Sequence, residues 1–396
     1  MKNLLKRYDW KKYDYALIAI VIILSLIGAF TVRLADAANQ TAFFRAQIMG
    51  LIMGLIIVAV VSLMDYHFIC RFVGLYYIVG VLLVFASRYT SLGTDLDTDT
   101  YRWLKIGGDG GITVQPTELV KIIVILTLAV FYSKMRTKME KFHVLVLGGL
   151  IALVPILFIL KQPDLSSSLV VCFIFLVIMF AAGTAYKILI PIISVGLPLG
   201  IVLIWYVQQP FQRILQDYQQ ERIMIFLHPE LDTSGKLWQQ QSSQLAIASG
   251  QLYGKFLDDG GSPIRNYLNV PVIESDFIWS VIGEEYGFLG GLIIIVLYGI
   301  LIVRCLFAAK KAQDRLGMLI ALGVSALFTF QVFANIGVAT FILPNTGLPL
   351  PFLSNGLSSM LSCMIAIGLI VNISIQPAKK SGGGFTMRQN DRELDL

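Results

Sequence analysis

Ten apolar stretches, each close to the length of a membrane-crossing helix, constrain this chain more than any other feature of its sequence. The hydrocarbon core of a bilayer is about 30 Å thick, and a helix needs roughly 20 mostly apolar residues to cross it. The stretches lie near residues 14–32, 47–64, 68–87, 118–133, 144–160, 168–183, 188–207, 277–303, 319–341 and 357–375. Of the 396 residues, 56% are hydrophobic and only 14% are charged, which leaves too little polar surface for a soluble globule. The sequence therefore predicts an all-α integral membrane protein with about ten transmembrane helices.

Lysine and arginine residues predict the orientation of these spans, because cytoplasmic loops beside spans carry an excess of positive charge. If both termini are cytoplasmic, every basic cluster falls on an inner segment; the clusters are Lys2–Lys12, Lys134–Lys141, Arg304–Arg315 and Lys379–Arg392. The net charge of +6 follows from this bias. The basic residues are dispersed around the spans and form no stripe, so a nucleic-acid partner is not expected.

The expected organisation is one membrane domain, residues 1–376, followed by a flexible cytoplasmic tail at 377–396. The tail is rich in glycine and then in mixed charges, a composition typical of mobile linkers. The first span lacks a small-residue cleavage site, so it is expected to be an anchor and not a removable signal peptide. A large extracellular loop, about residues 208–275, joins the seventh and eighth spans.

Cysteine, histidine and glycine patterns argue against several classes of site. The four cysteines lie in or beside apolar spans, so they are expected to be unpaired core residues. The three histidines show no metal-ligand spacing such as HExxH. No Walker or Rossmann glycine pattern is present, so no nucleotide cofactor is expected.

Residues 335–359 place two polar turns, broken by proline and glycine, between the last two apolar stretches. Irregular backbone at this depth persists only where protein or a water-filled cavity satisfies its peptide groups. The segment therefore predicts a cavity. Its candidate substrate-binding residues are Pro344, Gly347, Pro349, Pro351 and Ser354.

A second set of candidates surrounds the start of the fourth span. Arg102 and Trp103 precede Pro116, after which Glu118 and Lys121 fall on one helical face at i, i+3. Ionisable groups inside a span are costly unless they are paired or hydrated, so they are often kept for function. These four polar or aromatic side chains are predicted to bind substrate. The alternative is a capped helix that carries a self-satisfied ion pair.

The turn before the sixth span supplies two more candidates, Lys161 and Asp164, which three serines follow. Both are predicted to bind substrate. Asp164 or a serine could instead cap the helix, a use that stabilises a protein by about 1 kcal/mol. Capping and cavity lining are compatible.

The long outer loop is rich in amide and hydroxyl side chains, which suit hydrogen bonding to sugar or peptide groups. Its candidate substrate-binding residues are Arg213, Arg222, Gln241 and Ser242. The alternative is an ordinary amphipathic hairpin outside the membrane.

Asp276 is the candidate catalytic residue. It lies where the long outer loop meets the eighth span, so its carboxylate is expected at the boundary between water and an apolar helix. A carboxylate in that position can serve as a general base. The alternative is a helix cap that the helix dipole stabilises.

Five segments, in order along the chain, resemble the motifs of the SEDS family, the RodA, FtsW and SpoVE proteins of bacterial cell-wall synthesis. They are Gln-Pro-Thr-Glu-Leu-Val-Lys at 115–121, Lys-Gln-Pro-Asp-Leu at 161–165, a polar pattern at 222–247, Ser-Asp-Phe-Ile at 275–278 and the Pro-rich segment at 335–359. The resemblance extends from about Arg102 to Ser359. The chain departs from the usual motifs at Ser166 (usually Gly), Trp238 (Tyr), Val272 (Glu, with Glu274 two places later), Asn355 (Tyr) and Leu357 (Gly).

The resemblance implies a peptidoglycan glycosyltransferase that polymerises lipid II on the outer face of the bacterial cytoplasmic membrane. It assigns the essential carboxylate to Asp276 and leaves the role of Glu274 open. Cations that face the departing pyrophosphate would come from Arg102, Lys121, Lys161, Arg213 and Arg222. The implied partners are lipid II, membrane lipids, a class B penicillin-binding protein and other proteins of the elongation or division complex. The short N-terminus favours the elongation role.

Three alternatives stay open from the sequence. A divalent cation, Mg²⁺ or Mn²⁺, could be held by carboxylates such as Asp276 and Glu118. A lipid II flippase would also have many spans and intramembrane charges, although most of the polar motifs here gather on one face. A non-catalytic scaffold would need no carboxylates in a cavity.

Overall fold

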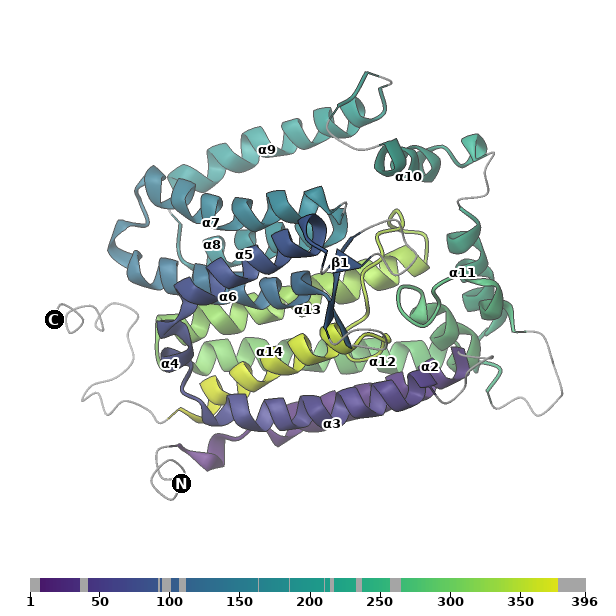
Figure 1. Cartoon of the computed structure of the whole chain (residues 1–396), viewed down its shortest axis with the longest axis horizontal. Helices are drawn as coiled ribbons and strands as arrows, with labels where there is room; N and C mark the ends of the chain where they lie inside the picture. The colour runs from purple at the N-terminus through teal and green to yellow at the C-terminus, as the bar shows by residue number, and fades with distance from the viewer. Residues whose placement is uncertain are drawn as a thin grey trace.

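A computed structural model shows the chain as a bundle of helices that run side by side (Figure 1). It describes residues 8–376 except 36–41, 92, 95–100, 107–111, 163, 185, 210, 214–216, 233–236 and 257–264. The predicted flexible tail, residues 377–396, lies outside the described residues, as do parts of the predicted outer loop.

Each of the ten predicted spans coincides with a helix. In chain order these helices are α2 (Tyr15–Ala35), α3 (Ala42–Leu63), α5 (Val73–Tyr89), α6 (Pro116–Lys134), α7 (Phe142–Lys161), α8 (Leu165–Ala181), α9 (Tyr186–Val207), α12 (Ile278–Lys311), α13 (Arg315–Ala339) and α14 (Leu357–Ile375). Shorter helices lie between and before them: η1 (Trp10–Lys12), α4 (Tyr66–Arg71), η2 (Arg136–Lys138), α10 (Asp217–Leu227), η3 (Pro229–Leu231), α11 (Trp238–Ser249) and η4 (Asn266–Asn269).

Within the described part of the chain, seven helices are long and apolar enough to cross a membrane, namely α2, α3, α6, α7, α12, α13 and α14. Helices α5 and α8, and residues 194–207 of α9, are apolar but shorter. The prediction of a multi-pass helical membrane protein is therefore confirmed. The count of ten spans and the cytoplasmic position of both termini stay predictions.

Helix α14 forms the centre of the bundle, where it packs against α3, α6, α12 and α13. In its most apolar part, 83% of the residues of α14 are buried, against 28% for α7. Helix α7 instead exposes apolar side chains such as Leu150 and Leu157. Such side chains suit contact with lipid, because the bilayer interior offers no water to polar groups.

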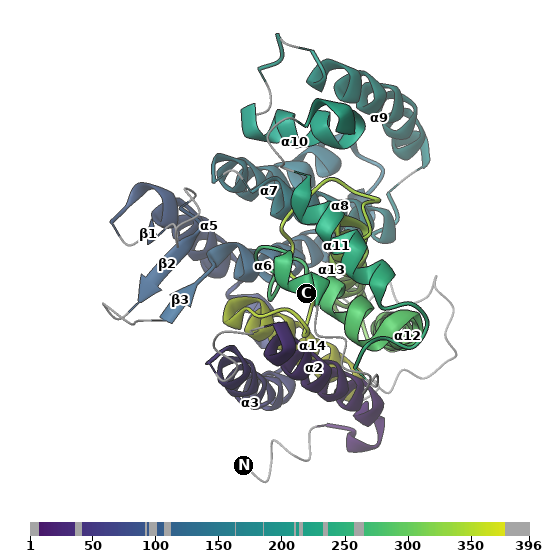
Figure 2. The ribbon, with the colours of Figure 1, turned by 90° about the vertical axis from the view of Figure 1, so that its right-hand side faces the viewer.

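A small antiparallel sheet lies at one side of the bundle, next to α5 (Figure 2). Its strands are β1 (Gly93–Thr94), β2 (Trp103–Ile106) and β3 (Ile112–Val114), in the order β1-β2-β3. Leu104 pairs with Gly93 on one side and with Val114 on the other. The sequence predicts an all-α fold, so this sheet was not expected. Strands this short cannot show the alternation by which a strand is recognised in a sequence.

Helix α12 begins with a separate helical segment, because Gly287 interrupts its backbone with φ of 65°. This left-handed conformation favours glycine. A Cβ built on Gly287 would also come within 2.3 Å of the backbone nitrogen of Gly254, in the turn after α11. This close approach allows the outer-loop turn to pack on the part of α12 that directly follows Asp276.

Two buried carboxylates hold the end of the outer loop on this segment. Glu284 pairs with Lys255 and accepts hydrogen bonds from the two backbone N–H groups of residues 266–267 (2.9 and 2.8 Å). Glu285 pairs with Arg265, with 2.8 Å between Oε1 and Nε. The described end of the outer loop is therefore fixed to the first part of α12, which directly follows the turn that contains the catalytic candidate.

Candidate active site

Asp276 lies in a turn, residues 271–277, that leads directly into α12. Its backbone N–H donates to the carbonyl of Val272 (3.2 Å), and the Ser275 hydroxyl donates to its carboxylate Oδ1 (2.8 Å). The residue is only half-buried, so the carboxylate is anchored and still reachable from outside. The N-cap residue of α12 is Phe277, which argues against Asp276 as the cap of this helix.

The Pro-rich loop (residues 340–356), which joins α13 to α14, lies against this carboxylate. Gly347 has φ of 66°, and a Cβ built on it would come within 2.9 Å of Asp276 Oδ2. Glycine is required on both counts, because left-handed backbone disfavours other residues and the carboxylate leaves little room for a side chain. The two strongest candidates from the sequence therefore meet in space.

Two polar side chains hold the Pro-rich loop and the Asp276 turn together. Asn335, near the end of α13, donates from its amide to the carbonyls of Asp276 (2.9 Å) and Leu348 (2.7 Å). The Ser354 hydroxyl donates to the carbonyl of Ser275. Buried amides and hydroxyls are costly unless they are bonded in this way. The position of the carboxylate is thus coupled to the conformation of the loop.

Helix α11 supports the start of the Pro-rich loop and the end of α13. The Gln240 amide donates to the carbonyls of Val338 and Leu343 (both 2.9 Å). The Ser243 hydroxyl donates to the carbonyl of Ala339 (2.8 Å). The amide-rich stretch of the outer loop is therefore part of the structure around the cavity.

Gln241 and Ser242, which we predicted to bind substrate, lie between these two residues on α11. Residues three apart share a helical face, so Gln240 and Ser243 face the loop while the two residues between them point to other sides. Gln241 is exposed and Ser242 is half-buried. Contact of these two residues with substrate stays a prediction.

The turn before α8 also contacts the Pro-rich loop, because the Ser166 hydroxyl donates to the carbonyl of Thr346. Asp164 is buried and caps α8, accepting the backbone N–H of Ser167 (3.0 Å). Capping, the alternative open from the sequence, is therefore confirmed for Asp164. Its contact with substrate stays a prediction.

Arg102 joins the small sheet to this turn, because its Nε donates to the carbonyl of Gln162 (3.1 Å). The Gln162 amide in turn donates to the carbonyl of Val84 on α5 (2.5 Å). Arg102 and Trp103 are half-buried, and Lys161 is exposed at the end of α7. Two of the cations predicted for the cavity, Arg102 and Lys161, thus flank the same turn.

Glu118 and Lys121 form a buried ion pair on α6, with 2.7 Å between Oε1 and Nζ and with 3% and 1% of the side chains exposed. The predicted i, i+3 pairing is confirmed, and Pro116 begins the helix as expected. The backbone N–H of Gln115 donates to the hydroxyl of Ser358 on α14 (3.0 Å). The start of α6 therefore contacts the start of α14, which follows the Pro-rich loop. The ion pair lies on the first turns of α6, close to this contact and inside the bundle.

The two outer-loop arginines are placed differently. Arg213 is exposed between α9 and α10, which lie at one edge of the bundle, apart from α12 (Figures 1 and 2). Arg222 belongs to α10, and its side chain is outside what the structure describes. The structure thus does not bring Arg213 to the Asp276 turn, and the roles of both arginines stay predictions.

The predicted divalent cation gains no support from the geometry. Among the described residues, no group of three or more histidine, cysteine, aspartate or glutamate side chains is arranged to hold a metal ion. Glu118, one of the two predicted ligands, already pairs with Lys121. A cation at Asp276 and Glu118 stays a prediction.

Comparison with known proteins decides the family. The family model described as "Cell cycle protein", which represents FtsW, RodA and SpoVE, matches residues 11–379. The chain belongs to this family. It is 30% identical to the probable peptidoglycan glycosyltransferase FtsW of Trichlorobacter lovleyi, over 94% of this chain and 96% of the relative. It is 29% identical to the peptidoglycan glycosyltransferase RodA of Treponema pallidum, over 91% and 97% of the two chains.

Solved structures share the fold. A chain from a peptidoglycan synthase complex that coordinates polymerization and crosslinking has a TM-score of 0.73 and 26% identity, and covers 91% of this chain and 97% of that one. RodA of Thermus thermophilus has a TM-score of 0.64 and 24% identity, over 91% and 96%. The resemblance to the SEDS family is confirmed, and the chain is a multi-pass bacterial membrane protein.

Two of the departures from the usual SEDS motifs, Ser166 and Val272, lie in the segments that contact the Pro-rich loop, namely the start of α8 and the turn 271–277. Ser166, where glycine is usual, supplies the hydroxyl that contacts Thr346, a bond that glycine cannot make. Val272, where glutamate is usual, is half exposed with φ of 54°. Glu274 is half-buried, and its backbone carbonyl accepts the N–H of Asn355 (2.8 Å). The role of the Glu274 carboxylate stays open.

Substitution Ser166→Gly, which restores the usual SEDS residue, tests whether this hydroxyl is a structural addition. We expect a stability loss of about 1 kcal/mol, the net value of one hydrogen bond, and polymerisation within about tenfold of wild type. Ser168→Ala is the matched control, because that hydroxyl bonds only to a carbonyl of its own helix turn. Thermal unfolding and polymerisation are measured together. Complete loss of activity with normal stability would instead make Ser166 a substrate contact.

Reversal of the buried ion pair tests whether its charges serve the SEDS cavity. We expect Glu118→Lys with Lys121→Glu to be inserted into the membrane and inactive, because the cation is displaced along the helix and now lies at the positive end of the helix dipole. The neutral double variant Glu118→Gln with Lys121→Met is the control for folding, since it leaves no unpaired charge buried. Recovery of polymerisation in the reversed variant would show that the pair is architectural.

Several residues that build this site were not predicted, namely Asn335, Gln240, Ser243 and Ser275. One signal was available for Asn335, because an amide in an apolar span is costly unless it is bonded. The other three lie in polar segments, where amides and hydroxyls are ordinary. Only their place in the fold distinguishes them.

Proposed function

We propose that this protein polymerises lipid II into glycan strands, with Asp276 as the general base. The chain is a peptidoglycan glycosyltransferase, as its family and its named relatives indicate. The observation that carries the finer proposal is the contact of the Asp276 carboxylate, anchored by Ser275, with Gly347 of the Pro-rich loop. A reachable carboxylate at the end of an apolar bundle suits a substrate with a lipid tail and a polar headgroup.

In the proposed reaction, the 4-hydroxyl of the GlcNAc of one lipid II attacks C1 of the MurNAc that ends the growing chain. Asp276 takes the proton of that hydroxyl as the new C–O bond forms. The bond between C1 and the pyrophosphate oxygen breaks, undecaprenyl pyrophosphate leaves with the electron pair, and the anomeric configuration inverts. Ser275 holds the carboxylate in place by its hydrogen bond to Oδ1.

Positive charge near the leaving pyrophosphate would stabilise the negative charge that develops there. Arg102 and Lys161 are the better candidates, because both flank the turn before α8, and that turn contacts the Pro-rich loop. Lys121 is compensated by Glu118 inside the bundle. We therefore assign Lys121 a smaller share of this role than the sequence suggested.

The proposed partner is a class B penicillin-binding protein, whose transpeptidase activity would cross-link the glycan product. The similarity to a chain from a peptidoglycan synthase complex that coordinates polymerization and crosslinking supports this proposal. Other proteins of the elongation or division complex would join the pair. The choice between elongation and division is tested by whether a fluorescently tagged copy lies along the side wall or at the septum.

The test of the function uses purified full-length protein, with and without the penicillin-binding partner, and lipid II as the only substrate. Glycan strands on a gel, with release of undecaprenyl pyrophosphate, are the expected products. A flippase would move fluorescent lipid II across vesicles and form no polymer, an outcome that would overturn the proposal. The names of the relatives favour the transferase.

A further inference from the structure

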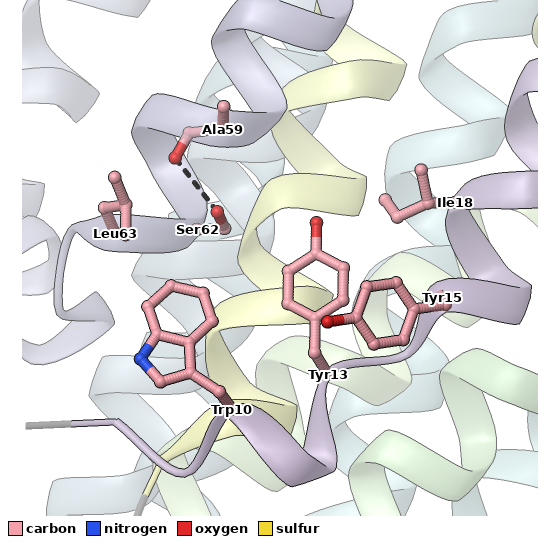
Figure 3. Close-up of a pocket in the computed structure, with 7 residues that line it drawn as sticks. All are labelled: Trp10, Tyr13, Tyr15, Ile18, Ala59, Ser62 and Leu63. Carbon is pink, nitrogen blue, oxygen red and sulfur yellow. Dashed lines mark hydrogen bonds between the residues drawn. The ribbon is translucent and has the colours of Figure 1, made fainter. Parts of the chain in front are cut away.

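A cavity of about 390 Å³ lies between the N-terminal segment and α3 (Figure 3). It is at the end of the bundle opposite to α11 and the Asp276 turn (Figure 1). Three aromatic residues, Trp10, Tyr13 and Tyr15, line one side, and one turn of α3 with Ala59, Ser62 and Leu63 lines the other. Binding pockets of about this size usually combine apolar walls with a few polar groups. Glycosyl transfer at Asp276 uses none of these residues.

The aromatic side of the cavity is held in place by contacts with three helices. The Tyr8 hydroxyl donates to the carbonyl of Leu63 on α3 (3.0 Å). The backbone N–H of Asp9 donates to the carbonyl of the last residue of α14 (2.9 Å). Asp14 pairs with Arg304 of α12 (3.2 Å). The cavity is therefore formed by an anchored segment.

The rings form a continuous apolar wall. The centroids of Trp10 and Tyr13 lie 6.2 Å apart in stacked planes, and those of Tyr13 and Tyr15 lie 4.7 Å apart. Rings with a polar edge are typical of the membrane–water interface. The opposite wall covers only about one turn of α3, roughly 6 Å along the helix axis. That length is too short to seat a partner helix, but it can cover the first few methylene groups of one hydrocarbon chain.

Two lysines, Lys11 and Lys12, lie in the chain between the lining residues Trp10 and Tyr13. Lys11 is exposed on η1, and Lys12 lies 3.5 Å from Asp9, with both side chains about 40% exposed. By the orientation that the basic clusters predict, this end of the bundle faces the cytoplasm. The cytoplasmic leaflet carries the anionic lipids that attract such lysines.

We infer that this cavity binds one acyl chain of an anionic phospholipid, with the lipid phosphate at Lys11 and Lys12. The aromatic wall and Ala59 contact the chain. Asp9 competes with the phosphate for Lys12. The site is distinct from the cavity that would take the glycosyl substrate.

The first test measures lipid preference by native mass spectrometry of the purified full-length protein. Phosphatidylglycerol and phosphatidylcholine with identical acyl chains are the probes. We expect phosphatidylglycerol to bind about 25-fold more tightly, since each of the two lysines near a lipid surface contributes about fivefold. Lys11→Gln with Lys12→Gln should remove this preference, whereas Asp9→Asn should increase it.

The control for charge is Lys138→Gln with Lys141→Gln, which removes two exposed lysines that do not line the cavity. This variant should keep the preference for phosphatidylglycerol. Equal binding of the two lipids by the wild type, or an equal loss of preference in both lysine variants, would overturn the inference. Equal binding of the two lipids by the wild type would show that the cavity accepts any lipid or detergent.

The second test fills the cavity without a change of charge. Ala59→Phe places a ring between the walls and should reduce binding of phosphatidylglycerol at least tenfold. The matched control is Val60→Phe, because Val60 is next to Ala59, is 53% exposed and does not line the cavity. With the other four tryptophans replaced by phenylalanine, brominated acyl chains should quench Trp10 fluorescence in the otherwise wild-type chain and in Val60→Phe, but not in Ala59→Phe. Equal quenching in all three proteins would place the chain elsewhere.

Discussion

Replacement of Asp276 by asparagine is expected to lower the rate of glycan polymerisation by a factor of about 100 or more. An amide cannot take the proton of the attacking hydroxyl. It is nearly isosteric with the carboxylate, however, and its oxygen can still accept the hydrogen bond from Ser275. The backbone bonds to Val272 and Asn335 do not involve this side chain. The variant should therefore unfold at close to the wild-type temperature, and polymer formed from lipid II is the quantity to measure.

The matched control is Glu274→Gln, the same carboxylate-to-amide change two residues earlier in the same turn. Glu274 contributes its backbone carbonyl to the bond with Asn355, and the substitution leaves that carbonyl in place. Polymerisation close to the wild-type rate is expected. An Asp276→Asn protein that still makes glycan strands at nearly the wild-type rate would remove Asp276 from the mechanism. An equal loss in both variants would show that the turn needs its total charge and not one general base.

The helices could be predicted from the sequence because a bilayer imposes one length and one class of side chain on every span. Each of the ten apolar stretches coincides with a helix, and Pro116 marks the start of α6. The ends were less predictable. Helix α12 continues to Lys311, beyond its expected end near residue 303. The prediction stopped too early because the last turns of the helix carry basic residues, which composition alone assigns to a loop.

The inward face of α11 could not be predicted. Residues 239–244 of α11 are polar on all sides of the helix, so they offer no apolar stripe to mark the buried face. The sequence therefore did not distinguish Gln241 and Ser242 from Gln240 and Ser243, and the structure turns the latter pair toward α13 and the Pro-rich loop. The resemblance to a family indicated the right segment but not the right residues within it.

Contacts between distant segments were beyond local reasoning. Ser166 and Thr346 are 180 residues apart and meet because α8 packs against α13, the helix that leads into the Pro-rich loop. The same holds for the small sheet, whose short strands have no pattern of their own. The sequence gathers most of the polar motifs on one face, and the structure shows that Asp276 and the Pro-rich loop adjoin there.

Gly347→Ala is expected to remove most polymerisation activity while the helical bundle stays folded. A residue with a side chain in the left-handed conformation costs about 1–2 kcal/mol, and the backbone here has φ of 66°. The added Cβ would lie 2.9 Å from Asp276 Oδ2, so the carboxylate must move aside. A shift of about 1 Å in a reacting group can lower turnover about 100-fold. Gly347→Val, with a branched side chain, should have the larger effect.

Gly356→Ala is the matched control within the same loop. Its backbone is extended, and the nearest atom to an added Cβ is the Cβ of Ser359 at 3.7 Å, an ordinary contact. This variant should polymerise at close to the wild-type rate. Thermal stability, co-purification with the penicillin-binding partner and glycan synthesis are measured on one preparation of each protein. Selective loss of synthesis in Gly347→Ala supports a loop that positions the carboxylate. Loss of all three properties together in Gly347→Ala would show that the Pro-rich loop is a packing element. Equal loss of synthesis in the two variants would show that the proximity of Gly347 to Asp276 does not determine activity.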